Sequence, residues 1–296
     1  MPTTDLATLN DAPADDFVAA IGEIFENAPW IAAEAAALRP FATVTALHDA
    51  MMTVVRNAPL DTKLTFLRGH PELAGKVARA GAMTAASIAE QGSLGLNRLS
   101  DAAFERFEAV NAAWRAKFGF PFIVCVRRHT RDSILACFAR RLDNAVATEI
   151  DASLDEIAFI SRLRLVEKLT GPGMPVTNGR LSTHVLDTVR GRPAAGVSVS
   201  LHEIGANETA LLAQTVTNAD GRTDAPLIAD QPLRIGTYEL RFEIGAYFAG
   251  LGADSPFLDI VPVRFRIAEP EAHYHVPLLT SPWTYTTYRG DRRTHV

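Results

Sequence analysis

The periodicity of apolar residues changes once along the chain, at the segment 171–180, and this change constrains the fold more than any other feature. Before it, apolar residues recur at spacings of three and four, as in Phe17, Ile21 and Phe25, which is typical of helices with one buried face. After it, apolar and polar residues alternate, as in TYELRFEI at 237–244, which is typical of half-buried strands. The segment itself reads GPGMPVTNGR, and its glycines and prolines interrupt regular structure.

This pattern predicts a multidomain protein. We expect an all-α helical bundle of six to eight helices over residues 1–170, a linker over 171–178 and an all-β antiparallel sandwich over 179–296. The length of 296 residues agrees with two domains.

Composition excludes several classes of protein. With 48% hydrophobic residues the chain can bury a core, so it is not disordered. It has no apolar run of ~18–20 residues that could span a membrane, and its start lacks the pattern of a secretory signal. We therefore expect a cytoplasmic protein without membrane attachment. The net charge of -5, without a basic cluster, argues against nucleic acid, and two cysteines are too few for a disulfide framework.

Two groups of polar residues stand out in the first half. His70 immediately precedes Pro71, and because proline favours the first position of a helix, we expect His70 at a helix entrance. There it either caps the helix at the surface or points into a cleft. Ser87, Glu90 and Gln91 are spaced so that a helix places them on one face. That face is either solvated or holds a ligand rich in hydrogen-bonding groups.

The run GFPFIVCV at 119–126 is more apolar than a surface segment needs. It is most simply core, although its backbone could edge a pocket.

Long motifs occur in order along the first half, among them HPELAGK, SIAEQ, FERFEAVNAAWRAKFGFPFIVCV and EIAFISRLRL. Over about residues 9–170 they resemble the 2-oxo-4-hydroxy-4-carboxy-5-ureidoimidazoline (OHCU) decarboxylase family. The resemblance implies that His70 is the catalytic acid or base, with Glu90 acting beside it. It also implies that Arg164 meets the substrate carboxylate, whereas Arg162 would point elsewhere on a helix. The implied pocket is further lined by Pro71, Ser87, Gln91, Phe122, Ile123, Val124, Cys125 and Val126.

The implied decarboxylation needs no metal or other cofactor, because the conjugated ring of the substrate accepts the electrons that carbon dioxide leaves behind. The protein must place one proton on one face of the ring. A histidine that titrates near neutrality can do so.

Three segments of the second half contain its candidate site residues. They are GRLSTHVLDTVRGRPAAGV at 179–197, TNADGRTD at 217–224 and HYHVPLLTSPWTYTTYRG at 273–290. They resemble 5-hydroxyisourate hydrolase, the enzymatic branch of the transthyretin family. The resemblance implies that His184, Arg222 and His275 are catalytic and that Tyr288 contacts the substrate.

Each of these four residues also has a structural alternative. A histidine on a strand can face an interface, an arginine beside a turn can be solvated, and a tyrosine near a chain end can serve packing. His273 and His275 share one face of a strand and could bind zinc, but no third ligand accompanies them at a familiar spacing. We therefore expect no metal site.

The two resemblances together imply a bifunctional enzyme of urate breakdown, with 5-hydroxyisourate and OHCU as its small-molecule substrates. Two alternatives stay open: a transthyretin-like carrier module fused to a helical scaffold, or a chain that retains only one activity. The carrier branch lacks the His–Arg–His set and the YRG ending that this chain has. The family also implies a homo-oligomer, a tetramer through the second half, with dimer contacts through the first half as a further option.

Overall fold

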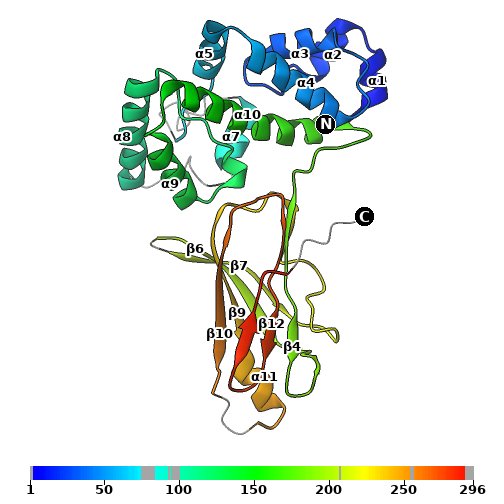
Figure 1. The fold of residues 1–296 in the computed structure, drawn as a ribbon, viewed down its shortest axis with the longest axis vertical. Coiled ribbons are helices and arrows are strands. Elements are labelled where there is room, and N and C mark those ends of the chain that lie inside the picture. The colour runs from blue at the N-terminus through cyan, green and yellow to red at the C-terminus, as the bar shows by residue number, and fades with distance from the viewer. Residues whose placement is uncertain are drawn as a thin grey trace. The chain divides into compact units, whose positions relative to one another are not determined.

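The computed structural model describes residues 3–74, 84–92, 94, 101–206, 208–253 and 257–290, and the chain divides into two compact units. The first comprises Met1–Arg127 and Ile134–Thr177, and the second comprises Arg128–Ser133 and Asn178–Val296. Figure 1 shows helices in the first unit and mainly strands in the second, so the predicted order of an α part and a β part is confirmed. In the described ranges, no helix is both long and apolar enough to cross a membrane.

Within the described residues, the regular structure of the first unit is helical apart from one short strand pair. Its described helices are α1 (Leu6–Asp11), α2 (Ala14–Ile21), α3 (Pro29–Ala36), α4 (Val44–Asn57), α5 (Leu60–Arg68), α7 (Ala85–Gly92), α8 (Asp101–Phe118), α9 (Arg131–Arg141) and α10 (Val146–Lys168). The predicted number of six to eight was wrong, since the described residues alone contain nine. Short breaks divide segments whose apolar period predicts a single helix. For example, α2 ends at Ile21, so Phe25 lies outside this helix, although its side chain is buried as predicted.

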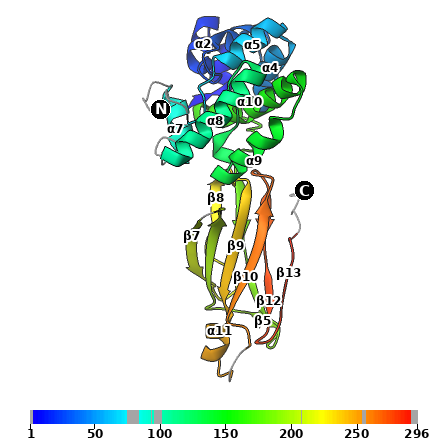
Figure 2. The ribbon, with the colours of Figure 1, turned by 90° about the vertical axis from the view of Figure 1, so that its left-hand side faces the viewer.

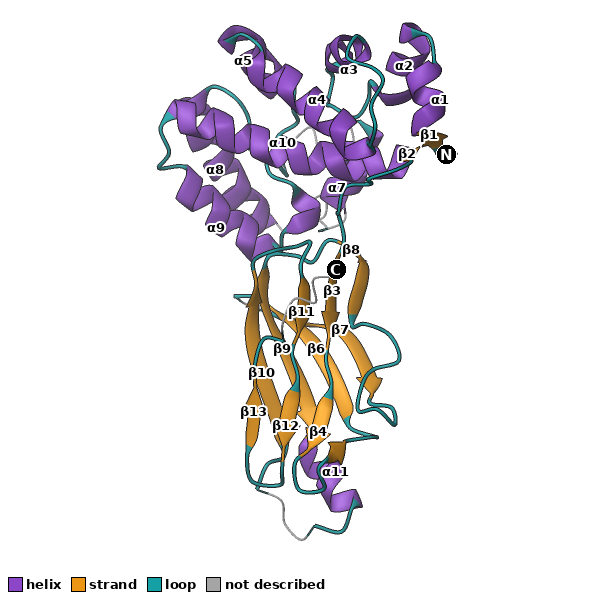
Figure 3. Cartoon of the chain, turned by 45° about the vertical axis from the view of Figure 1, so that its right-hand side comes forward, coloured by secondary structure: helices purple, strands orange, loops and turns teal. Residues whose placement is uncertain are grey.

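Helix α10 provides the framework for the first unit (Figure 3). It packs against α4 and α2, and it buries Leu154, Ile157 and Leu165. The strands β1 (Thr4–Asp5) and β2 (Leu169–Thr170) pair in parallel and tie the two ends of the unit together. The core therefore fixes the helix that carries Arg164.

The apolar run at 119–126 packs into an aromatic cluster. Trp114 of α8 is fully buried, and its ring lies 4.5–5.0 Å, centroid to centroid, from the rings of Phe118, Phe122 and Phe138. The run is thus core on one side, as its composition indicates.

The second unit is a β-sandwich (Figure 2). Its strands are β3 (Gly179–Ser182), β4 (Val185–Asp187), β5 (Arg192–Pro193), β6 (Ser198–Ile204), β7 (Thr209–Val216), β8 (Ile228–Gln231), β9 (Gly236–Glu243), β10 (Ile260–Ile267), β11 (His273–His275), β12 (Leu278–Thr280) and β13 (Tyr285–Thr287). One sheet has the order β10-β9-β6-β7, and the others are β11-β3-β8 and β13-β12-β4-β5. The alternating residues Val199, Leu201, Leu240 and Phe242 are buried, as their period predicts.

Two details of the sandwich differ from a wholly antiparallel, all-β prediction. The pairs β11–β3 and β12–β4 are parallel. The strand predicted over 237–244 ends at Glu243, and the helix α11 (Ile244–Gly250) begins at the next residue.

The segment 128–133 belongs to the second unit although it lies within the first half of the sequence. The Arg128 guanidinium forms a two-point ion pair with the Glu271 carboxylate, at 2.8 and 2.9 Å, and His129 forms a backbone bridge with Ile235. These pairings join residues more than a hundred positions apart, so no local pattern in the sequence predicts them.

Candidate active sites

The first unit contains a small cavity of about 40 Å³. It is lined by His70, Pro71, Leu73, Ser87, Glu90, Gln91, Phe122, Ile123, Val124, Val126, Ile160 and Arg164. All but one of the residues that we predicted for this pocket therefore come together. Cys125 is the exception: it is buried outside the cavity walls, and its backbone N–H donates to the Glu156 carboxylate at 2.8 Å.

His70 does not lie at a helix entrance, contrary to our prediction. It follows the C-terminal end of α5, and residues 71–74 form no helix. The physical reason is that a proline restrains the residue before it to extended conformations, so the same His-Pro pair also marks where a helix ends. The predicted side-chain position in a cleft survives, because His70 lines the cavity.

The surroundings of His70 determine its protonation. Its Nδ1 lies 3.0 Å from the carbonyl oxygen of Phe66, and the two rings meet edge to face at 4.9 Å. A carbonyl can only accept, so Nδ1 carries the hydrogen and Nε2 carries the lone pair. Burial lowers the pKa of His70 to about 4. At neutral pH this imidazole is therefore uncharged, and Nε2 is its basic position.

Arg164 of α10 connects two carboxylates in this site. Its Nε and Nη2 donate to Glu90 at 2.9 and 3.0 Å, and its Nη1 donates to Glu26 at 2.9 Å. Burial opposes the charged form, but Glu90 and Glu26 raise the pKa of Arg164. Arg162 lies elsewhere, over the ring of Phe159, as its position two residues earlier predicts.

The polar face of α7 is buried, which excludes the solvated alternative. Ser87 and Gln91 are each 4% exposed. Gln91 accepts from the backbone N–H of Ala74 at 3.0 Å and donates to the carbonyl of Glu72 at 3.2 Å. It thus clamps the loop that follows His70, a contact that the sequence did not predict.

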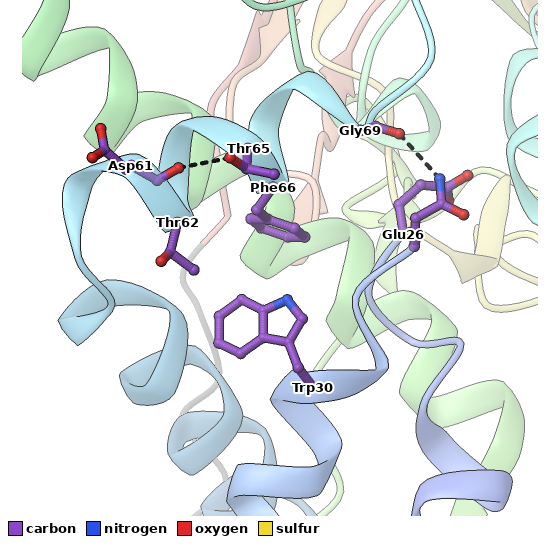
Figure 4. A pocket seen from close by; sticks show the side chains of 8 residues that line it. Glu26, Trp30, Asp61, Thr62, Thr65, Phe66 and Gly69 are labelled. Carbon is purple, nitrogen blue, oxygen red and sulfur yellow. Dashed lines mark hydrogen bonds between the residues drawn. The ribbon is translucent and has the colours of Figure 1, made fainter.

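Glu26 belongs to this site although its sequence position did not predict it. Its carboxylate accepts from the hydroxyls of Thr84 and Ser87 as well as from Arg164. Nothing in the local sequence distinguishes it from Glu23, a second carboxylate in the same largely apolar stretch. Glu26 also borders a separate hollow of about 400 Å³ (Figure 4), which lies along α5 beside Trp30 and Phe66. The Trp30 and Phe66 rings meet there edge to face at 6.4 Å.

In the second unit, one serine hydroxyl and three histidines form a chain of polar contacts. Ser182 Oγ lies 2.7 Å from Nε2 of His273 and 2.9 Å from Nδ1 of His275. The chain continues over 2.7 Å from Nε2 of His275 to Nδ1 of His184. Strand pairing produces this arrangement, because His275 stands opposite Ser182 in the register of β11 and β3. The sequence did not predict the contribution of Ser182.

The pKa values of these histidines are depressed. Burial, and then the charges of His184 and Arg222, lowers the pKa of His275 to about 4. Burial, followed by the charge of Arg222, lowers the pKa of His184. Both imidazoles are therefore neutral at pH 7, a form that can accept a proton.

Arg222 is held beside His184 by a tight turn. The two residues form a backbone bridge, and the N–H of Val185 donates to the carbonyl of Gly221 at 2.8 Å. Gly221 has a φ of +68°, and a Cβ there would meet Val185 at 2.4 Å, so only glycine permits this approach.

The YRG segment at 288–290 contacts the histidine cluster through Gly290. Its N–H donates to the carbonyl of His275 at 2.8 Å, and a Cβ at this position would meet the imidazole ring of His275 at 2.8 Å. Tyr288, which we predicted to contact the substrate, is 53% exposed two residues earlier.

The zinc alternative for His273 and His275 finds no ligand set. Among the residues that the structure describes, no group of three or more histidine, cysteine, aspartate or glutamate side chains could hold a metal ion.

The fold and the two sites define a two-part protein in which each part holds neutral imidazole beside arginine, an arrangement suited to acid–base chemistry. Family models match in both halves: OHCU decarboxylase over residues 10–166 and the HIUase/transthyretin family over 181–290. The chain therefore belongs to the OHCU decarboxylase family in its first half and to the HIUase/transthyretin family in its second.

Individual relatives divide in the same way. A 2-oxo-4-hydroxy-4-carboxy-5-ureidoimidazoline decarboxylase of Haloferax volcanii is 40% identical over 56% of this chain and 96% of its own. A 5-hydroxyisourate hydrolase of Deinococcus radiodurans is 54% identical over 37% of this chain and 94% of its own. A crystal structure of (S)-allantoin synthase covers 97% of this chain and 100% of its own, with 33% identity and a TM-score of 0.52.

Proposed function

We propose that the chain is a bifunctional enzyme of urate breakdown: the second unit hydrolyses 5-hydroxyisourate to OHCU, and the first decarboxylates OHCU to (S)-allantoin. The observation that carries this proposal is the similarity to (S)-allantoin synthase over nearly the whole of both chains. We assign the decarboxylase to residues 1–170 and the hydrolase to 179–296. Placing consecutive steps on one chain raises the concentration of the second site near the first.

In the decarboxylase site, Arg164 binds the substrate carboxylate and Nε2 of His70 handles the proton. The bond between the ring carbon and the carboxylate breaks, and its electron pair enters the conjugated ring. Carbon dioxide leaves, a ring nitrogen takes a proton, and the hydroxyl-bearing carbon that held the carboxylate becomes an enol carbon. The enol O–H is then lost while the neighbouring ring carbon, which bears the ureido group, receives one proton. Delivery of that proton to one face gives a single enantiomer. Support for these roles comes from the uncharged His70 and from the Arg164 guanidinium, whose planar fork matches a carboxylate.

In the hydrolase site, His184 takes the proton from water. In the productive arrangement, Nδ1–H of His184 donates to His275, Nδ1–H of His275 donates to Ser182, and the serine hydroxyl donates to His273. Nε2 of His184 is then the base. The water oxygen bonds to a ring carbonyl carbon, the ring C–N bond breaks, and the nitrogen receives the proton. Arg222 stabilises the developing oxyanion, and Tyr288 closes the site.

We also propose a homo-oligomer, a tetramer through the second unit, with dimer contacts through the first as a further option. In support, large apolar side chains of the second unit are exposed, among them Phe257, Trp283 and Tyr285. Such side chains are typical of surfaces that are covered in an assembly. Analytical ultracentrifugation of the full chain tests this proposal.

The experiment that tests the function generates 5-hydroxyisourate from urate with urate oxidase, adds the full chain, and follows absorbance and circular dichroism together. Faster decay that ends in optically active allantoin supports both activities. Faster decay that ends in a racemate leaves only the hydrolase. Unchanged decay that ends in optically active allantoin leaves only the decarboxylase, and unchanged decay that ends in a racemate leaves only a carrier role.

A further inference from the structure

We propose that Glu26 is a positioning residue of the decarboxylase site: it holds the Arg164 guanidinium in place while the substrate carboxylate displaces Glu90 from it. This inference rests on the proposed decarboxylase function and adds to it a residue that does not itself contact the substrate.

The two carboxylates that pair with Arg164 are not equivalent. The Glu26 side chain is 3% exposed, whereas the Glu90 side chain is 17% exposed and lines the cavity. Of the three guanidinium nitrogens of Arg164, Nη1 is the one that donates to Glu26. Glu90 instead accepts from both Nε and Nη2, which together form an edge that presents two parallel N–H groups to a carboxylate.

The cavity is too small for the substrate unless a side chain moves. Its volume of about 40 Å³ is far below the ~300–1,000 Å³ that is usual for ligand pockets, and the substrate is a substituted five-membered ring. Because Glu90 occupies the two-point edge of Arg164 from the cavity side, an entering carboxylate replaces it there like for like. Arg164 is then left with Glu26 as its buried anionic partner.

Glu26 is itself held in place for this task. The Thr84 hydroxyl donates to its Oε1 at 2.7 Å, and the Ser87 hydroxyl donates to its Oε2 at 3.2 Å. Ser87 lies in the first turn of α7, and Thr84 is the residue before this helix. Glu26 lies in the segment between α2 and α3. The guanidinium is thereby fixed against two other elements of the unit.

The decisive variant is Glu26→Asp, which keeps the charge but withdraws the carboxylate by one methylene group. If position matters, KM for OHCU rises about tenfold while kcat stays within threefold. The inhibition constant of (S)-allantoin stays within twofold, because this product has lost the carboxylate that Arg164 binds. A merely structural defect moves both constants together.

The matched control is Glu23→Asp, the same shortening three residues earlier on a carboxylate that is 83% exposed and pairs with Lys168. It leaves both constants unchanged. Thr84→Val serves as a second variant should Glu26→Asp fail to fold, since it removes one hydroxyl that holds Glu26; it raises KM about threefold.

The inference is overturned if KM of Glu26→Asp stays within twofold of wild type, or if KM and the allantoin constant rise in parallel. An inactive wild-type chain in the same series overturns the proposed function, and this inference with it. An active wild type with a wild-type-like Glu26→Asp overturns the inference alone.

Discussion

Nδ1 of His184 lies 2.7 Å from Nε2 of His275, and the two rings stack with centroids 4.9 Å apart and an interplanar angle of 16°. The other nitrogen of His275 reaches Ser182, so the protonation of one ring constrains the next. A hydroxyl has one hydrogen, so Ser182 donates to one of its two histidine neighbours and accepts from the other. The direction of the whole chain therefore sets which nitrogen of His184 is basic.

Replacing Ser182 with alanine interrupts this chain at its centre. We expect hydrolase kcat to fall about tenfold, less than the ~100-fold or greater loss for an acid–base group itself, because His184 and His275 stay in contact. The matched control is Ser200→Ala, which removes a similar serine–histidine contact of 2.9 Å to His202 on β6. Equal hydrolase rates for the two variants, measured with freshly generated 5-hydroxyisourate, contradict the relay.

The hydrolase should keep its activity in mildly acidic solution. The base, His184, must be neutral, and its pKa is lowered by burial and then by the charge of Arg222. Its partner His275, with a pKa lowered to about 4, is neutral at pH 7 as well. Activity is therefore present at neutral pH, and its acid limb lies below the usual histidine pKa of ~6.5. The pH profile of kcat/KM for the hydrolysis checks this expectation.

Arg222→Gln tests the cause of part of that shift. After burial, the arginine charge contributes to the lowered pKa of both histidines, so its removal moves the acid limb to higher pH as well as lowering the rate. Arg222→Lys keeps the charge and should leave the limb in place. A limb that does not move in the glutamine variant places Arg222 outside the electrostatics of the site.

Replacing His70 with asparagine should separate the two activities. We expect decarboxylation to fall by ~100-fold or more, since the group that handles the proton is lost, while hydrolysis continues at the wild-type rate. The optical signal of allantoin then disappears although 5-hydroxyisourate still decays quickly. Retained optical activity contradicts the role that we assign to His70.

The sequence predicted what local pattern determines, and it failed where distant segments meet. The change of period separated helices from strands, and the motifs named most of the residues that line the cavity. Glu26 was missed because its partner Arg164 is 138 residues away, and no local spacing relates them. Ser182 was missed for the same reason, since its contact with His275 arises from strand register over 93 residues.

Local signals also proved ambiguous in particular cases. The His70–Pro71 pair was interpreted as the start of a helix, but a proline equally ends the helix before it. The face of α7 was identified correctly from its spacing, yet spacing alone could not assign Gln91 to the backbone of Glu72 and Ala74.

His48 should make the stability of the first unit dependent on pH. It is 1% exposed, lies 2.9 Å from the Ser161 hydroxyl, and has its pKa lowered to about 4, first by burial and then by Arg162. The unfolded chain, with a histidine pKa of ~6.5, binds the proton more readily. The contribution of His48 to stability is therefore full above pH ~6.5 and falls by about 3 kcal/mol toward pH ~4. Urea unfolding followed by helical circular dichroism at both pH values checks this. In His48→Gln the dependence should shrink by that amount; an unchanged dependence assigns it to other groups.

The buried ion pair between Arg141 and Glu149 should stabilise the first unit and hold Ile123 in the wall of the cavity. Both side chains are almost fully buried, at 5% and 0% exposed, and Nη1 of Arg141 also donates to the carbonyl of Ile123 at 2.9 Å. Glu149→Gln leaves the arginine charge without its buried counterion, so we expect a loss of ~3–5 kcal/mol in unfolding free energy. The comparison is Asp155→Asn, which breaks an exposed pair with Arg56 and should cost at most ~1 kcal/mol.

Because Arg141 fixes Ile123, decarboxylase activity should fall in the Glu149→Gln variant alone, with hydrolase activity unchanged in both variants. Equal unfolding free energies for the two variants contradict a structural role for the buried pair.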